Sequence, residues 1–543
     1  MKTYFLSVFF GFLLISCARV GSPNGGTKDT IPPTMLGSNI DTPRVNVPRN
    51  LKELRLDFDE YVMLKEASKN LIISPPIKKI KKMLPANLAN KSVIIQWEDS
   101  LQANTTYNFN FGNSIRDNNE GNALPYFNFA FSTGEKIDDL YISGELKNIM
   151  SPPKSPTSNT GNLNEKNLVV GLYKLKDSMD FHQKPYYISK ADADGYYELN
   201  YLSPANYKII AFIDSNENSV FDSGAENVGF LKDSIQFQEN ISGLNLNLYP
   251  SKKAVKYLEM KENPGGILML FQGNPDQTNV LSINENLKDY KITSRPKSDS
   301  VFIWFDAKKD SLGIGKSDNL KFSYDIGNKQ DTVSVFYRMN AQNEMKISNE
   351  KGNLLPPKSK FEITSNYILD SINTEKWTLV SDSIAQPFTA KISEANPYKI
   401  LVDSDFKEGK KYSLNIPKET AISFYDRISK SYRFDFEADK SENYGNLHLK
   451  IINIPDKKFW FQLLNEKEEP VYSAYTNQSE MVFEYLKPAT YGVRILVDNN
   501  ENGIWDAADF ENQTFAEDVY NFNKKISARP LWSLNETWDL KEP

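Results

Sequence analysis

The chain has 543 residues, 40% of them hydrophobic and 12% aromatic, which is more than one hydrophobic core holds and predicts several domains. Its formal net charge of −6 is spread along the sequence, so no basic stretch points to nucleic acid. Two histidines (His182 and His448) and one cysteine (Cys17) occur, which excludes an intrachain disulfide and disfavours histidine-ligated metal sites and Ser–His or Cys–His catalysis.

The first sixteen residues predict a bacterial export signal. Lys2 supplies a basic start, and residues 4–15 are almost continuously apolar. As a helix this stretch would reach about 18 Å, short of the roughly 30 Å hydrocarbon core of a bilayer, so it is typical of a signal peptide. It ends in Leu-Ile-Ser-Cys at 14–17, which resembles the lipobox of bacterial lipoproteins. We expect lipidation of Cys17; the alternative is an ordinary signal peptide with a chance cysteine.

Residues 17–30 are rich in glycine and small polar residues, a composition that cannot bury a core and predicts a flexible tether. Ala18, rather than Asp, follows the cysteine, which is compatible with transfer to the outer membrane. Surface-export signals of Bacteroidota lipoproteins place acidic residues close behind the cysteine, whereas the first one here is Asp29. We therefore expect a lipid anchor in the outer membrane, with the periplasmic and surface faces both left open.

Beyond the tether, apolar residues alternate with polar ones, and no segment shows a sustained 3.6-residue period. Period-two alternation bounded by Asn, Asp, Gly or Pro predicts the strands of β-sandwiches. The early runs of this kind are Leu54, Leu56, Phe58; Val93, Ile95, Trp97; Tyr107, Phe109, Phe111; and Phe127, Phe129, Phe131. The sequence therefore predicts an all-β fold.

Two internal repeats organise the chain. At a spacing of 305 residues, Tyr412, Leu414, Ile416, Tyr432, Phe434 and Phe436 follow Tyr107, Phe109, Phe111, Phe127, Phe129 and Phe131 without a gap. This predicts two related sandwiches at 31–135 and 351–438.

At a spacing of 284 residues, Tyr-Leu-Ser-Pro-Ala-Asn-Tyr at 201–207 matches Tyr-Leu-Lys-Pro-Ala-Thr-Tyr at 485–491, and the Asp/Asn-rich segments that follow them match in the same frame. This predicts a second pair of sandwiches at 136–250 and 439–543. A further β-rich module is expected at 251–350.

Several motifs resemble Bacteroidota lipoproteins that open with a bacterial Ig-like domain of the S-layer type. They are Asp-Thr-Ile-Pro-Pro at 29–33, Phe-Asp-Glu-Tyr at 58–61, Ile-Ser-Pro-Pro at 73–76, Thr-Thr-Tyr at 105–107 and Phe-Ser-Thr-Gly at 131–134. Ile-Ser-Gly at 142–144, Asp-Gly-Tyr-Tyr at 194–197 and Pro-Ala-Asn-Tyr at 204–207 are similar to the carboxypeptidase-regulatory, transthyretin-like sandwich. The stretch from 526 to 538 is also similar to the C-terminus of these Bacteroidota lipoproteins, although their usual Arg-Ala-Asn-Trp run is altered here. The resemblance implies tandem Ig-like and transthyretin-like modules behind a lipoprotein signal, and it carries no activity with it.

The segment 498–509 has the pattern of a calcium loop. Glycine stands at position 6, and oxygen ligands fall at the expected places: Asp498, Asn500, Asn502, the carbonyl of Ile504, Asp506 and Asp509. In such a loop alternate side chains and one carbonyl converge on an ion. A strand and not an EF-hand helix leads into it, and Asp at position 12 replaces the bidentate Glu. The alternative is a set of Asx turns, in which Asn and Asp bond their own backbone.

The repeat places a similar set at Asp214, Asn216, Asn218, the carbonyl of Val220 and Asp222. Ser219 stands in place of the glycine and Ala225 at position 12, with Glu226 as a candidate for the missing ligand. Structural calcium is the one cofactor that the sequence suggests.

Other conspicuous residues have plainer interpretations. The segment 117–122 is interpreted as a polar hairpin loop. Trp97 and Trp304 follow strand alternation and are interpreted as core residues.

From these features we expect a non-catalytic, outer-membrane-anchored modular protein that acts as a scaffold or as an accessory subunit of an envelope complex. Its expected partners are envelope proteins, and nucleic acid is not among them. A surface glycan-binding protein is the first alternative, which an exposed planar row of aromatic side chains would favour. A carbohydrate-active enzyme is the second alternative, although no two of the 70 carboxylates stand out as a catalytic pair.

Overall fold

The computed structural model describes residues 29–151, 167–175, 180–263, 265–273, 279–294, 299–326, 329–339, 345–423, 425 and 427–541. The predicted signal peptide, Cys17 and most of the predicted tether lie outside the described residues. Strands make up 52% of the described residues and helices 2%, which confirms the predicted all-β fold of tandem sandwiches. The helices of the described ranges are single turns, α2 (Ala67–Asn70), η1 (Thr374–Lys376) and η2 (Ser441–Asn443). None of these is long and apolar enough to cross a membrane.

Module 1 contains β1 to β8, packed as two sheets. One sheet has the order β1-β2-β5-β4 with β7 beside β2, and the other has the order β3-β6-β8. Alternate residues of the facing strands point inward, so Leu54, Val93 and Phe109 are fully buried in one core. The strands are β1 (Met35–Ser38), β2 (Glu53–Leu64), β3 (Ile72–Ser74), β4 (Ile80–Leu84), β5 (Asn90–Trp97), β6 (Thr106–Gly112), β7 (Ile115–Asp117) and β8 (Phe127–Ser132).

Module 2 contains β9 to β16. Its larger sheet has the order β11-β10-β13-β14 with β15 beside β13, and the opposing sheet is β12-β9-β16. Tyr207 lies in the core and donates its hydroxyl hydrogen to the carbonyl of Ser203 (2.8 Å), which holds the turn before β13. The strands are β9 (Leu140–Asn148), β10 (Leu168–Lys174), β11 (Tyr187–Lys190), β12 (Tyr196–Leu202), β13 (Ala205–Ile213), β14 (Val228–Phe230), β15 (Ile235–Phe237) and β16 (Leu246–Leu248).

Module 3 contains β17 to β23 in the sheets β17-β18-β21-β20 and β19-β22-β23. Trp304 of β21 points out of module 3 into the core of the next module, where its ring contacts Tyr367 at 5.3 Å. The predicted burial of Trp304 is therefore confirmed, but its cover comes partly from the neighbouring module 4 and partly from Phe302 of its own strand. The strands are β17 (Lys256–Asn263), β18 (Gly266–Gln272), β19 (Asn279–Ser282), β20 (Tyr290–Ser294), β21 (Ser300–Phe305), β22 (Asp318–Ile326) and β23 (Lys329–Tyr337).

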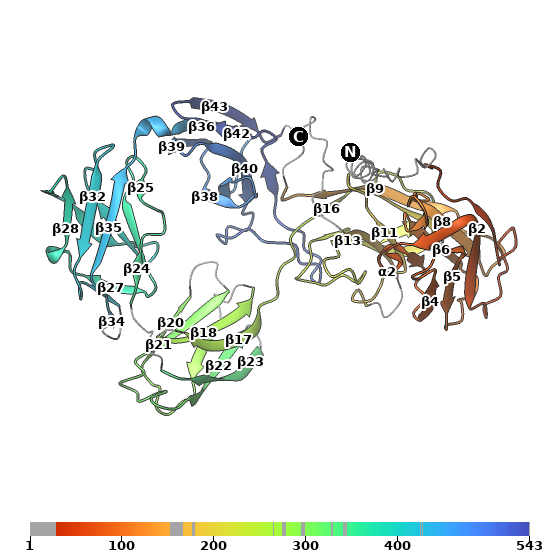
Figure 1. Cartoon of the computed structure of the whole chain (residues 1–543), viewed down its shortest axis with the longest axis horizontal. Coiled ribbons are helices and arrows are strands. Elements are labelled where there is room, and N and C mark those ends of the chain that lie inside the picture. The colour runs from red at the N-terminus through yellow and green to blue at the C-terminus, as the bar shows by residue number, and fades with distance from the viewer. Residues whose placement is uncertain are drawn as a thin grey trace, which may run out of the picture.

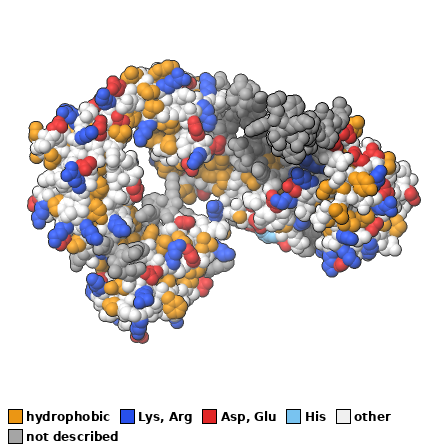
Figure 2. All heavy atoms as spheres, in the orientation of Figure 1, with side chains coloured by type: hydrophobic (Ala, Val, Ile, Leu, Met, Phe, Trp, Pro, Cys, Tyr) orange, Lys and Arg blue, Asp and Glu red, His pale blue; other side chains and the backbone are white. Residues whose placement is uncertain are grey.

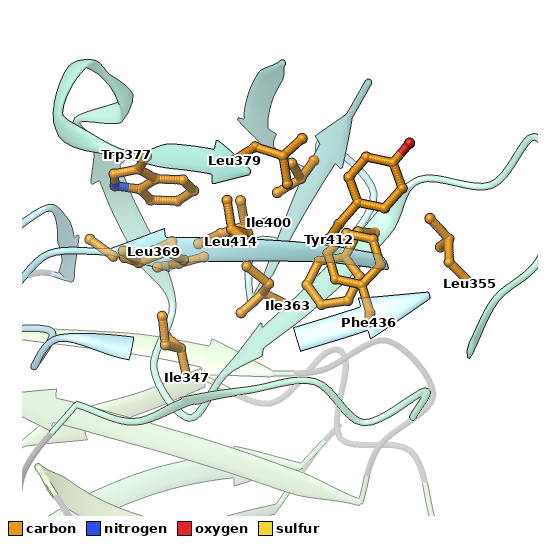
Figure 3. Packing of buried hydrophobic residues seen from close by; sticks show 14 of the residues in the cluster. Ile347, Leu355, Ile363, Leu369, Trp377, Leu379, Ile400, Tyr412, Leu414 and Phe436 are labelled. Atoms are coloured by element: carbon orange, nitrogen blue, oxygen red, sulfur yellow. The ribbon is translucent and has the colours of Figure 1, made fainter. Parts of the chain in front are cut away.

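Module 4 contains β24 to β35 and repeats the strand order of module 1. Its sheet β24-β26-β31-β30 matches β1-β2-β5-β4, and β28-β32-β35 matches β3-β6-β8. Tyr412 faces Phe436 across the strands as Tyr107 faces Phe131, so the 305-residue spacing holds in the pairing register. Both tyrosine hydroxyls accept a hydrogen bond from the backbone N–H five residues earlier (2.7 and 2.8 Å). Figure 3 shows the aliphatic and aromatic side chains of this core.

The strands of module 4 are β24 (Ile347–Ser348), β25 (Leu354–Leu355), β26 (Phe361–Ser365), β27 (Leu369–Ile372), β28 (Thr378–Ser381), β29 (Ile384–Gln386), β30 (Thr389–Ile392), β31 (Lys399–Asp403), β32 (Lys411–Ile416), β33 (Ala421–Ser423), β34 (Arg427–Ile428) and β35 (Tyr432–Ala438). Two of the three helical turns of the described ranges, η1 and η2, lie within this module and just after it.

Module 5 contains β36 to β43 and repeats the strand order of module 2. Its sheet β38-β37-β40-β41, with β42 beside β40, matches β11-β10-β13-β14 with β15 beside β13, and β39-β36-β43 matches β12-β9-β16. Tyr491 donates to the carbonyl of Lys487 (2.8 Å) as Tyr207 donates to Ser203. The strands are β36 (Gly445–Ile452), β37 (Phe459–Leu464), β38 (Pro470–Thr476), β39 (Glu480–Leu486), β40 (Ala489–Val497), β41 (Val519–Asn521), β42 (Ile526–Ala528) and β43 (Ser533–Asp539).

Modules 2 to 5 follow one another round a closed circuit, and module 1 projects from module 2 (Figure 1). The circuit closes where module 5 returns to module 2: Arg494 of β40 donates to the carbonyl of Met150 (3.2 Å), and Asn521 donates to the carbonyl of Ile149 (2.7 Å). The visible face mixes basic, acidic and scattered apolar side chains without a large field of one sign (Figure 2). The chain is thus a docked assembly of sandwiches.

We expect core truncation to destabilise a module strongly. Phe109→Ala removes a side chain with 0% exposure and should lower the free energy of unfolding of module 1 by about 3–5 kcal/mol, because the cavity adds to the lost burial. Phe336→Ala replaces a side chain of module 3 that is 73% exposed, and it should change the free energy of unfolding of module 3 by less than about 0.5 kcal/mol. Denaturant unfolding of both purified variants measures the difference, and equal destabilisation would contradict the assigned cores.

Candidate functional site: the paired Asp/Asn loops

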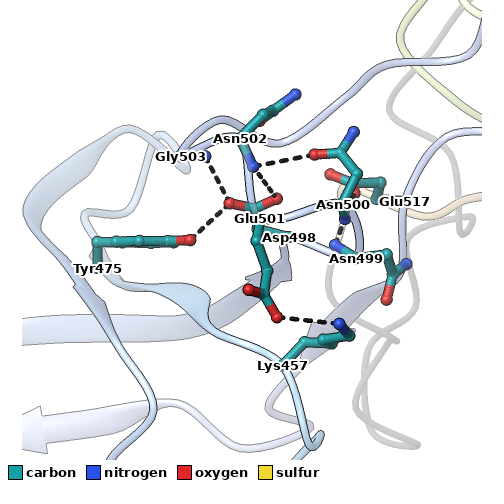
Figure 4. A network of polar contacts seen from close by, with 9 residues as sticks. All are labelled: Lys457, Tyr475, Asp498, Asn499, Asn500, Glu501, Asn502, Gly503 and Glu517. Atoms are coloured by element: carbon teal, nitrogen blue, oxygen red, sulfur yellow. Dashed lines mark hydrogen bonds and ion pairs between the residues drawn. The ribbon is translucent and has the colours of Figure 1, made fainter.

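The second Asp/Asn loop begins where β40 ends, and its first carboxylate is fully buried. Asp498 has 0% exposure. Its carboxylate oxygens accept hydrogen bonds from the backbone N–H groups of Asn502 (3.1 Å) and Gly503 (2.7 Å) and from the hydroxyl of Tyr475 (2.6 Å), as Figure 4 shows. These donors satisfy a charge that would otherwise be costly to bury.

The pKa values of this pair follow from the same contacts. Burial alone would raise the pKa of Asp498, but the hydrogen bonds from Tyr475 and from the loop backbone outweigh it and hold the pKa below its ordinary range. The carboxylate in turn raises the pKa of Tyr475 to about 12. Asp498 is therefore ionised at neutral pH, and Tyr475 remains a hydrogen-bond donor.

The other side chains of the second loop bond to one another. The amide nitrogens of Asn500 and Asn502 donate to one oxygen of Asp506 (2.6 and 2.8 Å). The side-chain oxygen of Asn502 accepts from the backbone N–H of Ile504 (2.8 Å). This is the pattern of Asx turns, in which short polar side chains replace backbone partners.

The first loop repeats the hydrogen bonds that the second loop makes within itself. Asp214, 1% exposed, accepts from the backbone N–H groups of Asn218 (3.0 Å) and Ser219 (2.9 Å). Asn216 donates to Asp222 (2.6 Å), as Asn500 donates to Asp506. The oxygen of Asn218 accepts from the N–H of Val220 (2.6 Å). The 284-residue repeat therefore extends to individual atoms.

Position 6 of both loops lies in the left-handed region of backbone conformation. The φ angle is 83° at Gly503 and 60° at Ser219. Glycine adopts such angles freely, whereas a residue with a side chain is strained there. The Gly-to-Ser difference between the repeats therefore alters local strain without altering the shape of the loop.

A buried glutamate closes each loop, and sequence reasoning found only one of the two. Glu517 accepts from the backbone N–H groups of Asn499 (2.6 Å) and Asp506 (2.9 Å). Glu226 accepts from the equivalent groups of Ser215 (2.8 Å) and Asp222 (3.1 Å). Glu517 lies 291 positions after Glu226, seven more than the repeat spacing, so an insertion moves it out of frame. Aligning the strand after each loop would have found it.

Asp509 does not face the second loop, although the calcium pattern expects it there. Its carboxylate accepts from the backbone (3.1 Å) and side chain (2.9 Å) of Asn512 and lies 3.6 Å from the ammonium of Lys252 in the chain that leaves module 2. Asp498, Asn500, Asn502 and Asp506 are brought together, whereas Asp509 is not. Among the described residues, no group of three or more His, Cys, Asp and Glu side chains has the arrangement of a metal site.

The donor set fits calcium in chemistry but shows no unmet demand for it. Carboxylate and amide oxygens are the ligands that calcium prefers. In the described chain the buried side-chain atoms left without a hydrogen-bond partner include none from either loop. The calcium hypothesis, including the carbonyls of Ile504 and Val220, therefore stays a prediction beside the Asx-turn arrangement.

Two other groups of residues lie where the sequence placed them. Asp117, 3% exposed, accepts backbone N–H bonds from four successive residues, 119 to 122, which makes the segment a self-contained polar loop. Trp97 is 2% exposed in the core of module 1.

The two histidines each lie near one glutamate: His182 is 3.6 Å from Glu511, and His448 is 3.5 Å from Glu480.

Comparison with known proteins identifies module 1. Residues 29–133 match the family model of a bacterial Ig-like domain, so the predicted Ig-like domain at the start of the described chain is confirmed. No curated protein matches the chain.

Solved structures that align over much of the chain do so at low identity. The surface layer protein SbsC, domains 1–6, has 10% identity over 93% of this chain and 68% of that chain, with a TM-score of 0.15. The major pilin subunit of Bacillus cereus has 9% identity over 74% of this chain and 99% of that chain, with a TM-score of 0.13. The Bacteroides ovatus protein SGBP-B of a mixed-linkage glucan utilization locus, solved with a heptasaccharide, has 9% identity over 70% and 96%, with a TM-score of 0.19.

We expect Asp498→Asn to lower stability at neutral pH and to lose this effect in acid. A carboxylate whose pKa is depressed in the folded state stabilises the fold above its unfolded pKa, which is about 4, and this stabilisation disappears as pH falls through the folded value. Melting temperatures of wild type and Asp498→Asn should therefore differ most near pH 7 and converge in acid. The control is Asp370→Asn, at an exposed position of β27, which should show no such convergence. A gap that is independent of pH would contradict the assigned role of the charge.

Calcium binding is checked by the melting temperature of the full chain in chelator and in millimolar calcium. Extracellular calcium modules bind at about 10⁻⁴–10⁻³ M, and a hundredfold excess of ligand stabilises a fold by about 2.7 kcal/mol. The calcium hypothesis therefore expects a rise in melting temperature that Asp498→Ala combined with Asp506→Ala abolishes. Identical melting in both buffers would leave the Asx turns as the complete account of these loops.

Proposed function

We propose that the protein is a non-catalytic outer-membrane lipoprotein whose modules form a scaffold within an envelope complex. The observation that carries this proposal is the docking of its sandwiches. Trp304 of module 3 is buried in the core of module 4. Arg427 of module 4 donates to the carbonyls of Gly265 and Phe305 in module 3 (3.0 and 2.7 Å). Domains joined by flexible linkers move independently unless such interfaces hold them, so these contacts support a role that depends on fixed geometry.

The polar residues of the Asp/Asn loops support the same role. Asp214 and Asp498 are occupied by backbone N–H groups of their own loops. Glu217, at the tip of the first loop, forms a 2.5 Å ion pair with Lys69 of module 1. Glu501, the matching residue of the second loop, pairs with Lys457 (2.9 Å) within module 5. These side chains make structural contacts within loops and between modules, as expected for a protein whose role is architectural.

Binding of glycan has less support from the surface. A sugar platform needs a row of exposed aromatic rings. Of the seven tryptophans, Trp532 is 51% exposed and the others are buried or half-buried; Trp460 and Trp505 donate to backbone carbonyls of the second Asp/Asn loop and its closing glutamate. The exposed aromatic residues are spread over modules 1, 2, 3 and 5: Tyr61, Tyr126, Tyr196, Phe336, Tyr472, Phe515 and Trp532. In the described chain no ring contact joins two of them.

The outer-membrane anchor rests on the export signal and the lipobox-like motif, and the site of attachment is Cys17. The tether that follows would let the modules lie clear of the lipid surface. Envelope proteins are the proposed partners.

We expect Cys17→Ser to release the protein from the outer-membrane fraction and to abolish co-purification of partners from solubilised membranes. One acyl-modified residue supplies the attachment, and local concentration at the membrane favours partner binding. Fractionation in high salt and affinity purification of tagged wild type and variant measure both effects. A variant that still sediments with outer membranes would contradict the anchor. Oligosaccharide binding without any enriched protein partner would replace the scaffold by the glycan alternative.

A further inference from the structure

Module 2 carries an apolar patch on the outer side of its larger sheet. Antiparallel sandwich sheets commonly face water on their outer side, but here the outward residues of β10, β13 and β14 and two loop phenylalanines are buried or half-buried. The patch consists of Val169, Tyr173, Phe181, Ile210, Phe212, Phe221, Val228 and Phe230. Such a surface is stable only when another part of the protein covers it.

The cover is the loop of module 5 between Asp506 and Glu517. Phe510, 3% exposed, meets the rings of Phe181, Phe221 and Phe230 edge-to-face at 5.1, 5.4 and 5.3 Å. Phe515 stacks on Phe230 at 5.0 Å. An aromatic side chain enclosed by three others is the arrangement of an anchor residue in an interface.

Polar contacts fix the position of this loop. The backbone of Ala508 bonds on both sides to the chain that leaves module 2: its N–H donates to Pro250 (3.0 Å) and its carbonyl accepts from Lys252 (2.7 Å). The ammonium of Lys208, in β13, donates to the side chain of Gln513 (2.5 Å). The loop is therefore held by main-chain pairing and by an aromatic anchor together.

This loop, residues 507–516, is called the docking loop, and most of its length has no counterpart in module 2. In module 2, Asp222 and Glu226 are joined by Ser-Gly-Ala at 223–225, whereas Asp506 and Glu517 are joined by ten residues. The inserted length contains Phe510 and Phe515. Both ends of the insertion are clamped, because Asp506 and Glu517 exchange two hydrogen bonds (2.9 and 3.0 Å). The Asp/Asn network is thus the base from which the loop projects.

We propose that residues 507–516 are a latch: seating of Phe510 on module 2 holds modules 2 to 5 in the closed circuit, and withdrawal of the latch opens the circuit while every module stays folded. Modules 2, 3, 4 and 5 are joined in sequence by the chain, but module 5 meets module 2 through non-covalent contacts alone. The patch on module 2 is thus an interaction surface whose partner is an aromatic-tipped loop of the same chain.

The test uses a disulfide across the closure. Ser251 and Ala508 face each other in a parallel β-bridge, a spacing at which two cysteines can bond. In the Cys17→Ser background, Ser251→Cys with Ala508→Cys leaves these two thiols alone in the full chain. We expect rapid formation of the internal disulfide, seen as a mobility shift in non-reducing electrophoresis. Adding Phe510→Ala should slow it by at least about tenfold, because the buried ring no longer favours closure. Adding Phe336→Ala, on the exposed face of module 3, is the matched control and should leave the rate unchanged.

A second variant keeps the inference testable if Phe510→Ala disturbs folding. Replacing residues 507–516 by Ser-Gly-Ala gives module 5 the short loop that module 2 already folds with. X-ray scattering of this variant, without engineered cysteines, should give a larger radius of gyration at unchanged β-content by circular dichroism. Unchanged crosslinking with Phe510→Ala, or unchanged scattering of the short-loop variant, would overturn the latch.

Discussion

The arrangement of the molecule depends on a strand that must be covered on both faces. In β13, Ile209 and Ala211 point into the core of module 2, and Ile210 and Phe212 point the other way. Leaving those outward side chains in water would cost about 25 cal/mol for each Å² of apolar surface. The matching outward positions of β40 are Arg494 and Leu496, which are also buried, and the Arg494 guanidinium donates to Gln462 and to the carbonyl of Met150. Two modules of one topology thus differ in the chemistry of the same strand face, and the insertion in module 5 covers the apolar face of module 2.

The periodic features of the chain could be predicted from its sequence, because core positions recur wherever strands pair in the same register. Tyr107 and Tyr412 hold the same place in modules 1 and 4, and their hydroxyls accept the same backbone bond. The Asp/Asn loops were visible for a related reason. Each Asn or Asp bonds within a few residues of itself, so the spacing of Asp498, Asn500 and Asn502 contains most of the information about their geometry.

Features that depend on distant segments could not be predicted in this way. Glu517 accepts the same backbone hydrogen bonds in module 5 that Glu226 accepts in module 2. The insertion before Glu517 shifts it out of the 284-residue spacing, so the repeat does not align the two glutamates. Asp509 fits position 12 by counting, yet the backbone pairing of the docking loop carries it towards Lys252. Trp304 lies on the opposite face of β21 from the core residues Val301, Ile303 and Phe305, so alternation within the strand does not account for its burial. Its cover includes module 4, which the pattern of one strand cannot show. The uninterrupted apolar run in β13 did carry a signal of burial on both faces.

The closed circuit has a mechanical consequence. In an open string of domains, tension passes through every linker in turn, and the weakest module yields first. Here a pull that enters through module 2 reaches module 4 by two arms, one through module 3 and one through module 5 (Figure 1). Each arm bears part of the load, so neither module 3 nor module 5 transmits all of it. A frame of this kind also resists bending, because a hinge at one junction is restrained by the opposite arm, and it achieves this stiffness with packed faces and hydrogen bonds instead of disulfides.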